Sequence, residues 1–281
     1  MSLTSLLNRP DVRARFRQEF STSRLKVKPE LRVPPQARDA SHVGTAFDYL
    51  LRFYLERLNP SALTHETLAE KVLDLLPARS PEGKTARRIV TTAKTNLLRY
   101  RQTGTLDDAL VESALALARL DLVHRAGLTQ YVGEPPDPIA VAELKQLIAL
   151  VDPAVFTARQ FCVLNPTFGL ASHMVGGADA DLVLDHMLID VKVTKDSSLK
   201  RPDLNQVIGY YILYDIEKGS PIEEWLKSPP SITHVAIYFA RHAYLHMIPI
   251  DEILNPETYP AFREWFQGRA REESQLLRRA R

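Results

Sequence analysis

The segment that most limits the folds open to this chain is a stretch of alternating acidic and apolar residues, Gly176 to Lys192 (GGADADLVLDHMLIDVK). Its two halves, Ala180–Leu184 and Leu188–Lys192, are rich in residues that favour strands. Between them, Asp185 and His186 are typical of a tight turn. The stretch therefore predicts a β-hairpin with a two-residue loop.

The loop sets the register of the hairpin. Across the strands it pairs Leu184 with Met187, Val183 with Leu188, Leu182 with Ile189, and Asp181 with Asp190. Because side chains alternate along a strand, one face is expected to carry Asp179, Asp181, Asp190 and Lys192. The opposite face is expected to carry Ala180, Leu182, Leu184, Ile189 and Val191.

Carboxylates crowded on one sheet surface repel each other, and each raises the pKa of its neighbours. A hard divalent cation relieves this repulsion, since carboxylate oxygens are ligands that suit Mg²⁺ and Mn²⁺. The acidic face of the hairpin is therefore a candidate metal site. Taken alone, the same pattern fits a hairpin whose polar face lies in water about as well.

Composition limits the classes of function. The chain has 281 residues, enough for one large domain or for one domain with a sizeable insertion. Its formal net charge is only +2, so a nucleic-acid site has to be a local patch. The single cysteine, Cys162, excludes an internal disulfide and a cysteine-based metal site, and its apolar neighbours predict a core position. We see no signal-peptide run and no membrane-length apolar segment, and therefore expect a cytoplasmic protein without membrane contact.

The first part of the chain, residues 1–40, is basic and punctuated by prolines. Asp11–Phe20 is expected to form a short helix, and Pro29 and Pro34–Pro35 favour extended chain beyond it. Two interpretations of this basic N-terminal arm stay open. It either lies on the phosphates of a nucleic acid or wraps on the protein's own domain with its charges in water.

The next segment, Ser41–Leu58, carries apolar residues at helical spacing, and Ser41 is its expected N-cap. Asp48 lies at the border of the apolar stripe of this helix. Its carboxylate is either a rim residue in water, which the helix alone favours, or a group with a buried partner.

The remaining chain divides into a helical block and a strand-rich part. Helices are predicted in the block at 64–76, 81–100, 106–125 and 139–150. The basic helix 81–100 fits either contact with a DNA backbone or an ordinary solvated surface. Beyond the block we expect strands at 160–164, 234–239 and 244–250, and helices at 204–215 and 256–281. On helix 204–215, Gln206 and Tyr210 are one turn apart and share a face.

Four pieces of this sequence, in order, resemble the motifs of the PD-(D/E)XK nuclease superfamily, and within it the RecB-type and CRISPR-associated exonuclease branch. They are GTAFD (44–48), similar to a Gly-x-x-apolar-His helix entry; GGADADLVL (176–184), similar to a Gly-x-x-Asp strand; LIDVK (188–192), which matches apolar-apolar-(Asp/Glu)-apolar-Lys; and Gln206-x-x-x-Tyr210. Asp48 stands where that branch has His. The helical block 60–155 has no counterpart that we can assign.

The resemblance implies an α/β fold with a restriction-endonuclease-like core, in which a central mixed sheet is flanked by helices. The basic arm 1–40 would precede one nuclease-like domain, 41–281, with a helical insertion at about 60–155.

The resemblance also implies a metal centre. Asp181 and Asp190 would hold one or two Mg²⁺ or Mn²⁺ ions, with the backbone carbonyl of Val191 and the side chain of Asp48 as further ligands. For the strand ligand, spacing from the glycine pair favours Asp179, whereas facing across the hairpin favours Asp181. We assign Asp181, and keep Asp179 as a second ligand or as a partner of the groups around the ligands.

The same resemblance gives roles to the other site residues. The metal would polarise the scissile phosphate and lower the pKa of a water. Lys192 would orient that water and neutralise charge that develops in the transition state. Gln206 and Tyr210 would brace the site and touch the substrate backbone.

Together these features predict a metal-dependent deoxyribonuclease that hydrolyses phosphodiester bonds in DNA, in phage defence or in DNA repair and processing. A helicase or defence-system partner would be a separate chain. The alternative is a catalytically weak nucleic-acid-binding or regulatory module that keeps the nuclease fold, and Asp48 in place of His keeps it open. A small-molecule hydrolase or transferase is disfavoured, because the sequence has no Gly-rich phosphate loop, nucleophile elbow or Rossmann fingerprint.

Overall fold

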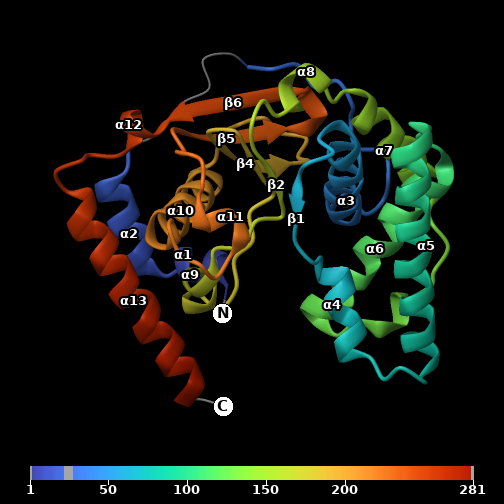
Figure 1. Ribbon diagram of the computed structural model, residues 1–281, viewed down its shortest axis with the longest axis horizontal. Coiled ribbons are helices and arrows are strands. Elements are labelled where there is room, and N and C mark those ends of the chain that lie inside the picture. Colours follow the sequence, from blue (N-terminus) through green and yellow to red (C-terminus); the bar gives the residue numbers. More distant parts are fainter. Residues whose placement is uncertain (1, 22–27, 280–281) are drawn as a thin grey trace.

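The structure, a computed structural model, describes residues 2–21 and 28–279. Six strands form one mixed sheet with helices on both faces (Figure 1). In space the strands keep their sequence order: β1 (Leu63–Thr64), β2 (Cys162–Leu164), β3 (Leu182–Leu184), β4 (Met187–Lys192), β5 (His234–Phe239) and β6 (Tyr244–Pro249). β1 pairs in parallel with β2 and β4 with β5, and the other neighbours are antiparallel. The predicted α/β class, with a central mixed sheet flanked by helices, is confirmed.

The helices on the two faces of the sheet come from different parts of the chain. One face carries α3 (Ala40–Leu58), α4 (Leu68–Leu75), α5 (Pro81–Thr103), α6 (Asp108–Ala126), α7 (Pro138–Ala149) and α8 (Pro153–Phe156). The other carries α1 (Leu3–Leu7), α2 (Pro10–Glu19), α9 (Gly169–Met174), α10 (Arg201–Glu217), α11 (Glu224–Lys227), α12 (Ile250–Ile253) and α13 (Tyr259–Arg279). Two short 3-10 turns are η1 (Thr129–Tyr131) and η2 (Ala240–His242).

Alternation along the strands divides the core into two apolar layers. Leu182, Leu184 and Ile189 pack in the layer that contains α3, which we call the α3 layer. Val183 and Leu188 pack in the layer that contains α10, the α10 layer. The β3–β4 hairpin therefore packs against helices on both sides of the sheet, and burial of apolar surface on both faces fixes the place of α3 relative to α10.

The hairpin has the register expected from its loop, with Leu182 opposite Ile189, Val183 opposite Leu188 and Leu184 opposite Met187. Asp185 turns the chain at φ 51°, and its carboxylate accepts hydrogen bonds from the backbone N–H groups of Arg159, Gln160 and Phe161. One expectation for the apolar face was wrong. Ala180 packs in the α10 layer rather than the α3 layer, because regular strand pairing begins only at Leu182.

Two helix starts also differ from expectation. The N-cap of α3 is Asp39 rather than Ser41, because the Asp39 carboxylate accepts the backbone N–H of His42 at 3.0 Å. The predicted helix 64–76 begins only at α4, where Thr67 caps it. The residues before it form β1, since backbone pairing with β2 outweighs their helical pattern. Cys162 is buried and free, as expected.

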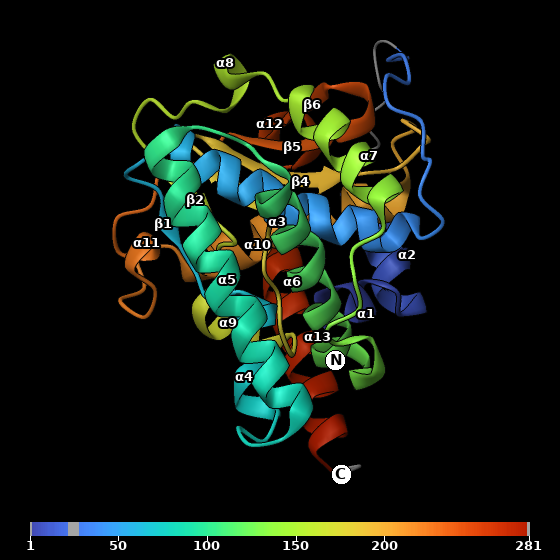
Figure 2. The ribbon, with the colours of Figure 1, turned by 90° about the vertical axis from the view of Figure 1, so that its right-hand side faces the viewer.

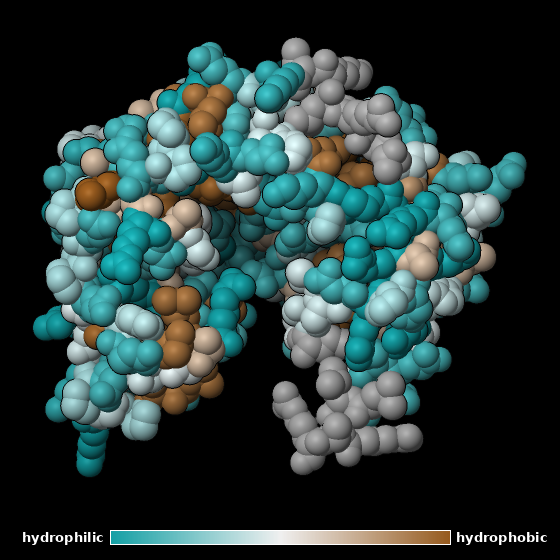
Figure 3. All heavy atoms as spheres, turned by 180° about the vertical axis from the view of Figure 1, so that it is seen from behind, coloured by the Kyte–Doolittle hydropathy of each residue, from teal (hydrophilic) through white to brown (hydrophobic). Residues whose placement is uncertain are grey.

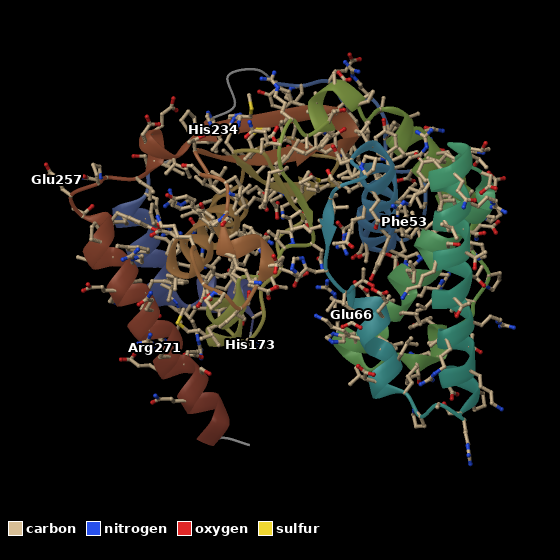
Figure 4. All side chains as sticks on the ribbon, viewed as in Figure 1. Phe53, Glu66, His173, His234, Glu257 and Arg271 are labelled. Carbon is tan, nitrogen blue, oxygen red and sulfur yellow. The ribbon has the colours of Figure 1, made fainter. Side chains whose placement is uncertain are left out.

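The helical block from α4 to α7 stands apart from the group formed by α9, α10 and α13, so the molecule has two arms below the sheet (Figure 1). From the opposite side, a deep notch separates the arms and much of its lining is hydrophilic (Figure 3). Glu66, just before α4, and His173, on α9, lie on facing sides of this notch (Figure 4). Seen from the side of the block, α3 lies behind α5 and next to the sheet (Figure 2). None of the helices that the structure describes is long and apolar enough to cross a membrane.

One buried ion pair joins the helical block to the end of the sheet and to the N-terminal segment. Arg241, which follows β5, lies 2.5 Å from Glu143 on α7, and both residues are fully buried. The other carboxylate oxygen of Glu143 accepts hydrogen bonds of 2.7 Å from the backbone N–H groups of Gln36 and Ala37. Arg241 also donates to the carbonyl of Val33 at 3.1 Å. Loss of one ion would leave the other buried without compensation.

We expect Glu143→Ala to lower the free energy of unfolding by about 3–5 kcal/mol, because Arg241 and two backbone N–H groups lose their partner. Urea denaturation measures this difference. Glu112→Ala, at an exposed position on α6, is the matched control and is expected to change it by less than about 0.5 kcal/mol. Equal effects of the two substitutions would contradict the role of the buried pair.

Candidate functional site

A cavity of about 220 Å³ lies where the hairpin meets α3 and α10. Its lining includes the carboxylates Asp48, Asp179 and Asp181, together with Gln206 and Tyr210. α1, α4 and α6 complete the walls, so both arms of the molecule contribute to it. Side chains predicted from three separate motifs of the sequence therefore meet around one hollow.

The hairpin positions two of the acidic groups. Asp181 comes directly before β3, and its carboxylate accepts the backbone N–H of Val191 at 2.6 Å. This bond joins Asp181 to β4, in which Asp190 directly precedes Val191. Asp190 is buried, at 2 % exposed, and close enough to raise the pKa of Asp181 by like charge.

A polar chain runs from Asp190 to α10. Lys192 Nζ lies 2.7 Å from Asp190 Oδ2 and donates to Gln206 Oε1 at 3.0 Å. Gln206 Nε2 in turn donates to the hydroxyl of Tyr210 at 2.9 Å. One helical turn separates Gln206 from Tyr210, so the expected shared face brings both to the lysine. The structure places all four residues in one network.

Asp48 comes from the middle of α3 and forms an ion pair with Arg52, one turn further along. Its side chain is 24 % exposed, and that of Arg52 is 12 % exposed. The Arg52 guanidinium also lies 5.3 Å from the ring centre of Tyr49. The position in water that the helix alone favoured was wrong, because Asp48 lines the cavity and has a partly buried cationic partner.

The site holds more carboxylate charge than its cations compensate. Burial raises the pKa of Asp181 well above its ordinary value, and the like charges of Asp48 and Asp190 raise it further. Burial likewise raises the pKa of Asp48 and of Asp190, against the attraction of Arg52 and Lys192 respectively. Burial opposes the charged form of Lys192, but attraction to Asp190 outweighs it and raises the pKa of the amine. Lys192 therefore stays a cation.

The donor set suits a hard divalent cation, although its members now pair with side chains. Within residues 2–21 and 28–279, no three His, Cys, Asp or Glu side chains are arranged to hold a metal ion. Arg52 and Lys192 instead lie against Asp48 and Asp190. Asp190 Oδ2 is buried, and its charged partner is Lys192 Nζ at 2.7 Å. Clustered carboxylate oxygens whose pKa values are raised by burial suit a divalent cation.

Several groups at this cavity were not predicted. Tyr49 donates to Asp121 Oδ1 at 2.5 Å, and Arg125 lies 3.6 Å from the same carboxylate. Arg52 had a signal in the sequence, because it lies four residues after Asp48 on a predicted helix. Asp121 and Arg125 belong to α6, in the block without a motif, and nothing in the sequence placed α6 against α3.

No protein-family profile, curated protein or solved structure matches this chain. Its function is therefore inferred from the geometry of this cavity and from the sequence motifs that meet there.

We expect Asp181→Asn to stabilise the metal-free protein at neutral pH. A carboxyl whose pKa is raised on folding favours the folded state less as the pH rises from its ordinary pKa through the raised one. Asn keeps an oxygen for the Val191 N–H and removes the charge. In EDTA, calorimetry should show a melting temperature about 2–4 °C higher, which corresponds to about 1 kcal/mol for a chain of this size.

Asp185→Asn, in the turn of the same hairpin, is the control. Burial opposes its charge, but backbone N–H donors of Arg159, Gln160 and Phe161 outweigh burial and lower the pKa of Asp185. Its charge is therefore stabilising above its ordinary pKa, and neutralising it should not raise the melting temperature. An equal rise in both variants, or none at Asp181, would contradict the crowding of charge at the cavity.

Proposed function

We propose that this chain is a metal-dependent nuclease that hydrolyses phosphodiester bonds in DNA. In this proposal its core is restriction-endonuclease-like and it belongs to the PD-(D/E)XK superfamily, near the RecB-type and CRISPR-associated exonuclease branch. One observation carries the proposal: Asp48 and Asp181 line one cavity, and the ion pair of Asp190 and Lys192 joins its wall through the hydrogen bond from Lys192 to Gln206. Gln206 and Tyr210 join the same network.

Asp181 and Asp190 are the residues that would hold Mg²⁺ or Mn²⁺, with the carbonyl of Val191, with Asp48 and with Asp179 as further oxygen donors. The chemistry that such an ion supplies is polarisation of a phosphate oxygen and acidification of a water. The mutual repulsion of the carboxylates favours this use, because a cation relieves the strain that burial and like charge impose on them. The same carboxylates thus account both for the unfavourable electrostatic free energy of the site and for the proposed affinity for a cation.

Lys192 has the charge and the position to act on the phosphate. It is cationic, partly buried at 19 % exposed, and held between Asp190 and Gln206. In the reaction, Lys192 neutralises negative charge that develops on the phosphate and orients the attacking water. Gln206 keeps the amine in place, and Tyr210 fixes the amide of Gln206 through its hydroxyl.

Arginines of α3 and α6 suit an anionic substrate. Arg52 and Arg125 line the same cavity as the carboxylates, although the chain as a whole carries a formal charge of only +2. A phosphodiester that enters would meet cations from α3 and α6 beside the acidic floor. Guanidinium groups bind phosphate oxygens in pairs, which favours a nucleic-acid backbone over a neutral ligand.

The alternative, a nucleic-acid-binding module that does not cleave, has its own supporting observation. Asp48 pairs with Arg52, so the helix ligand is engaged by an internal cation. If this pair persists when DNA and a divalent cation are present, the chain binds nucleic acid without hydrolysing it.

Cleavage of single- and double-stranded DNA in Mg²⁺ or Mn²⁺ tests the proposal. We expect cleavage by the wild type, none in EDTA, and a loss of at least about 10²-fold for Asp190→Asn and for Lys192→Gln, because each removes an electrostatic group of the reaction. Asp185→Asn, which alters a carboxylate outside the cavity, should cleave as the wild type does.

Binding measured alongside cleavage separates the two functions. DNA binding retained in Asp190→Asn, with cleavage lost, supports the enzyme. A wild type that binds DNA but cleaves neither DNA nor RNA in either metal would leave only the binding module.

A further inference from the structure

A second cavity adjoins the carboxylate cavity. It has a volume of about 170 Å³ and is lined by residues of α1, of α2 and of the first turns of α10. Thr4 and Gln206 line both cavities, so the two hollows share a wall. Gln206 is also the residue that holds Lys192, which places the second cavity directly beside the proposed reaction centre.

The lining of this second cavity is strongly basic. Arg13 and Arg17 come from α2 and Arg201 from α10, and we call the hollow between them the arginine cavity. Asp203 is the one acidic residue in its lining. In the described part of the chain none of the three arginines forms an ion pair, whereas Arg15, between two of them, pairs with Glu19.

Arg201 is fixed in place by neutral groups. Its Nε donates to Asn205 Oδ1 at 2.9 Å, and Nη2 donates to the carbonyl of Phe20 at 3.0 Å. These bonds orient the guanidinium without neutralising it. Burial and the neighbouring charge of Arg17 lower the pKa of Arg201.

A purely structural role does not account for the whole cluster. Arg201 ties the end of α2 to α10, but Arg13 and Arg17 are exposed and line the same hollow. Like charges gathered at one place destabilise a protein unless an anion binds between them.

We propose that the arginine cavity binds a backbone phosphate of the nucleic acid, next to the phosphate held at the carboxylate cavity. The inference rests on the proposed function for the identity of the neighbouring phosphate. Arginine binds phosphate oxygens through paired N–H groups and reads no base, so the site adds affinity without sequence preference. Because it lies on one side of the reaction centre only, it sets the side on which the bound strand continues.

The test is the affinity of a short mixed-sequence single-stranded oligonucleotide, followed by fluorescence anisotropy in Ca²⁺ over a range of salt. We expect Arg13→Gln/Arg17→Gln to weaken binding about tenfold or more and to reduce the slope of log affinity against log salt by about 0.7, for one backbone phosphate that is no longer neutralised. Arg13→Lys/Arg17→Lys keeps the charges and should keep the slope.

Arg15→Gln is the matched control on the same helix. It removes one positive charge that pairs with Glu19 and lies over Phe262, away from the arginine cavity. Its affinity and salt slope should stay near those of the wild type. Thermal unfolding checks that α2 stays folded in every variant.

Equal binding by the double Gln variant and by Arg15→Gln would overturn the inference, and so would a wild type that does not bind the oligonucleotide. Inorganic phosphate as a competitor distinguishes a site for free phosphate from a site for a nucleic-acid strand. The inference fails if phosphate stabilises the wild type but not the double Gln variant, while the affinity for the oligonucleotide is the same in both. The proposed function fails separately. If the wild type binds the oligonucleotide through these arginines but never cleaves DNA, the phosphate site is supported and the proposed nuclease activity is contradicted.

Discussion

The candidate site depends on a fold that holds like-charged, buried or partly buried carboxylates together. Asp181 and Asp190 come from the hairpin and Asp48 from α3. Burial raises the pKa of Asp181 and of Asp190, and the charge of Asp48 raises both further. Packing on both faces of the sheet supplies the free energy that keeps them there, since the strands that carry the acids bury apolar side chains against α3 and α10. The fold thus maintains a local arrangement that is unfavourable by itself.

The chain compensates part of this cost with its own cations. Arg52 pairs with Asp48, and Lys192 with Asp190, so that the carboxylates have partners in the absence of a metal. These pairs explain why no ready metal-binding group exists in the described residues even though the donor set suits one. In the nuclease that we propose, the same cations become free to meet phosphate charge when a divalent ion takes the carboxylates.

Basic groups reach the site from both arms of the molecule. Arg52 and Arg125 belong to the helical side, while Arg13, Arg17 and Arg201 belong to α2 and α10 across the sheet. A chain with a formal net charge of only +2 can therefore place positive side chains around a group of carboxylates. This distribution links the two proposals, because a nucleic-acid strand bound as we propose contacts the arginines and passes the carboxylates and Lys192.

The sequence alone determined the features that depend on near neighbours. The register of the hairpin, with Leu182 opposite Ile189, and the shared face of Gln206 and Tyr210 follow from repeats of two and of about four residues, which backbone geometry imposes locally. Only the tertiary structure decided that Asp48 lines a cavity with Asp181, that α6 borders this cavity, and that α2 meets α10 at the arginine cavity. Those outcomes depend on how segments distant in the chain pack across a sheet, and no local period carries that information.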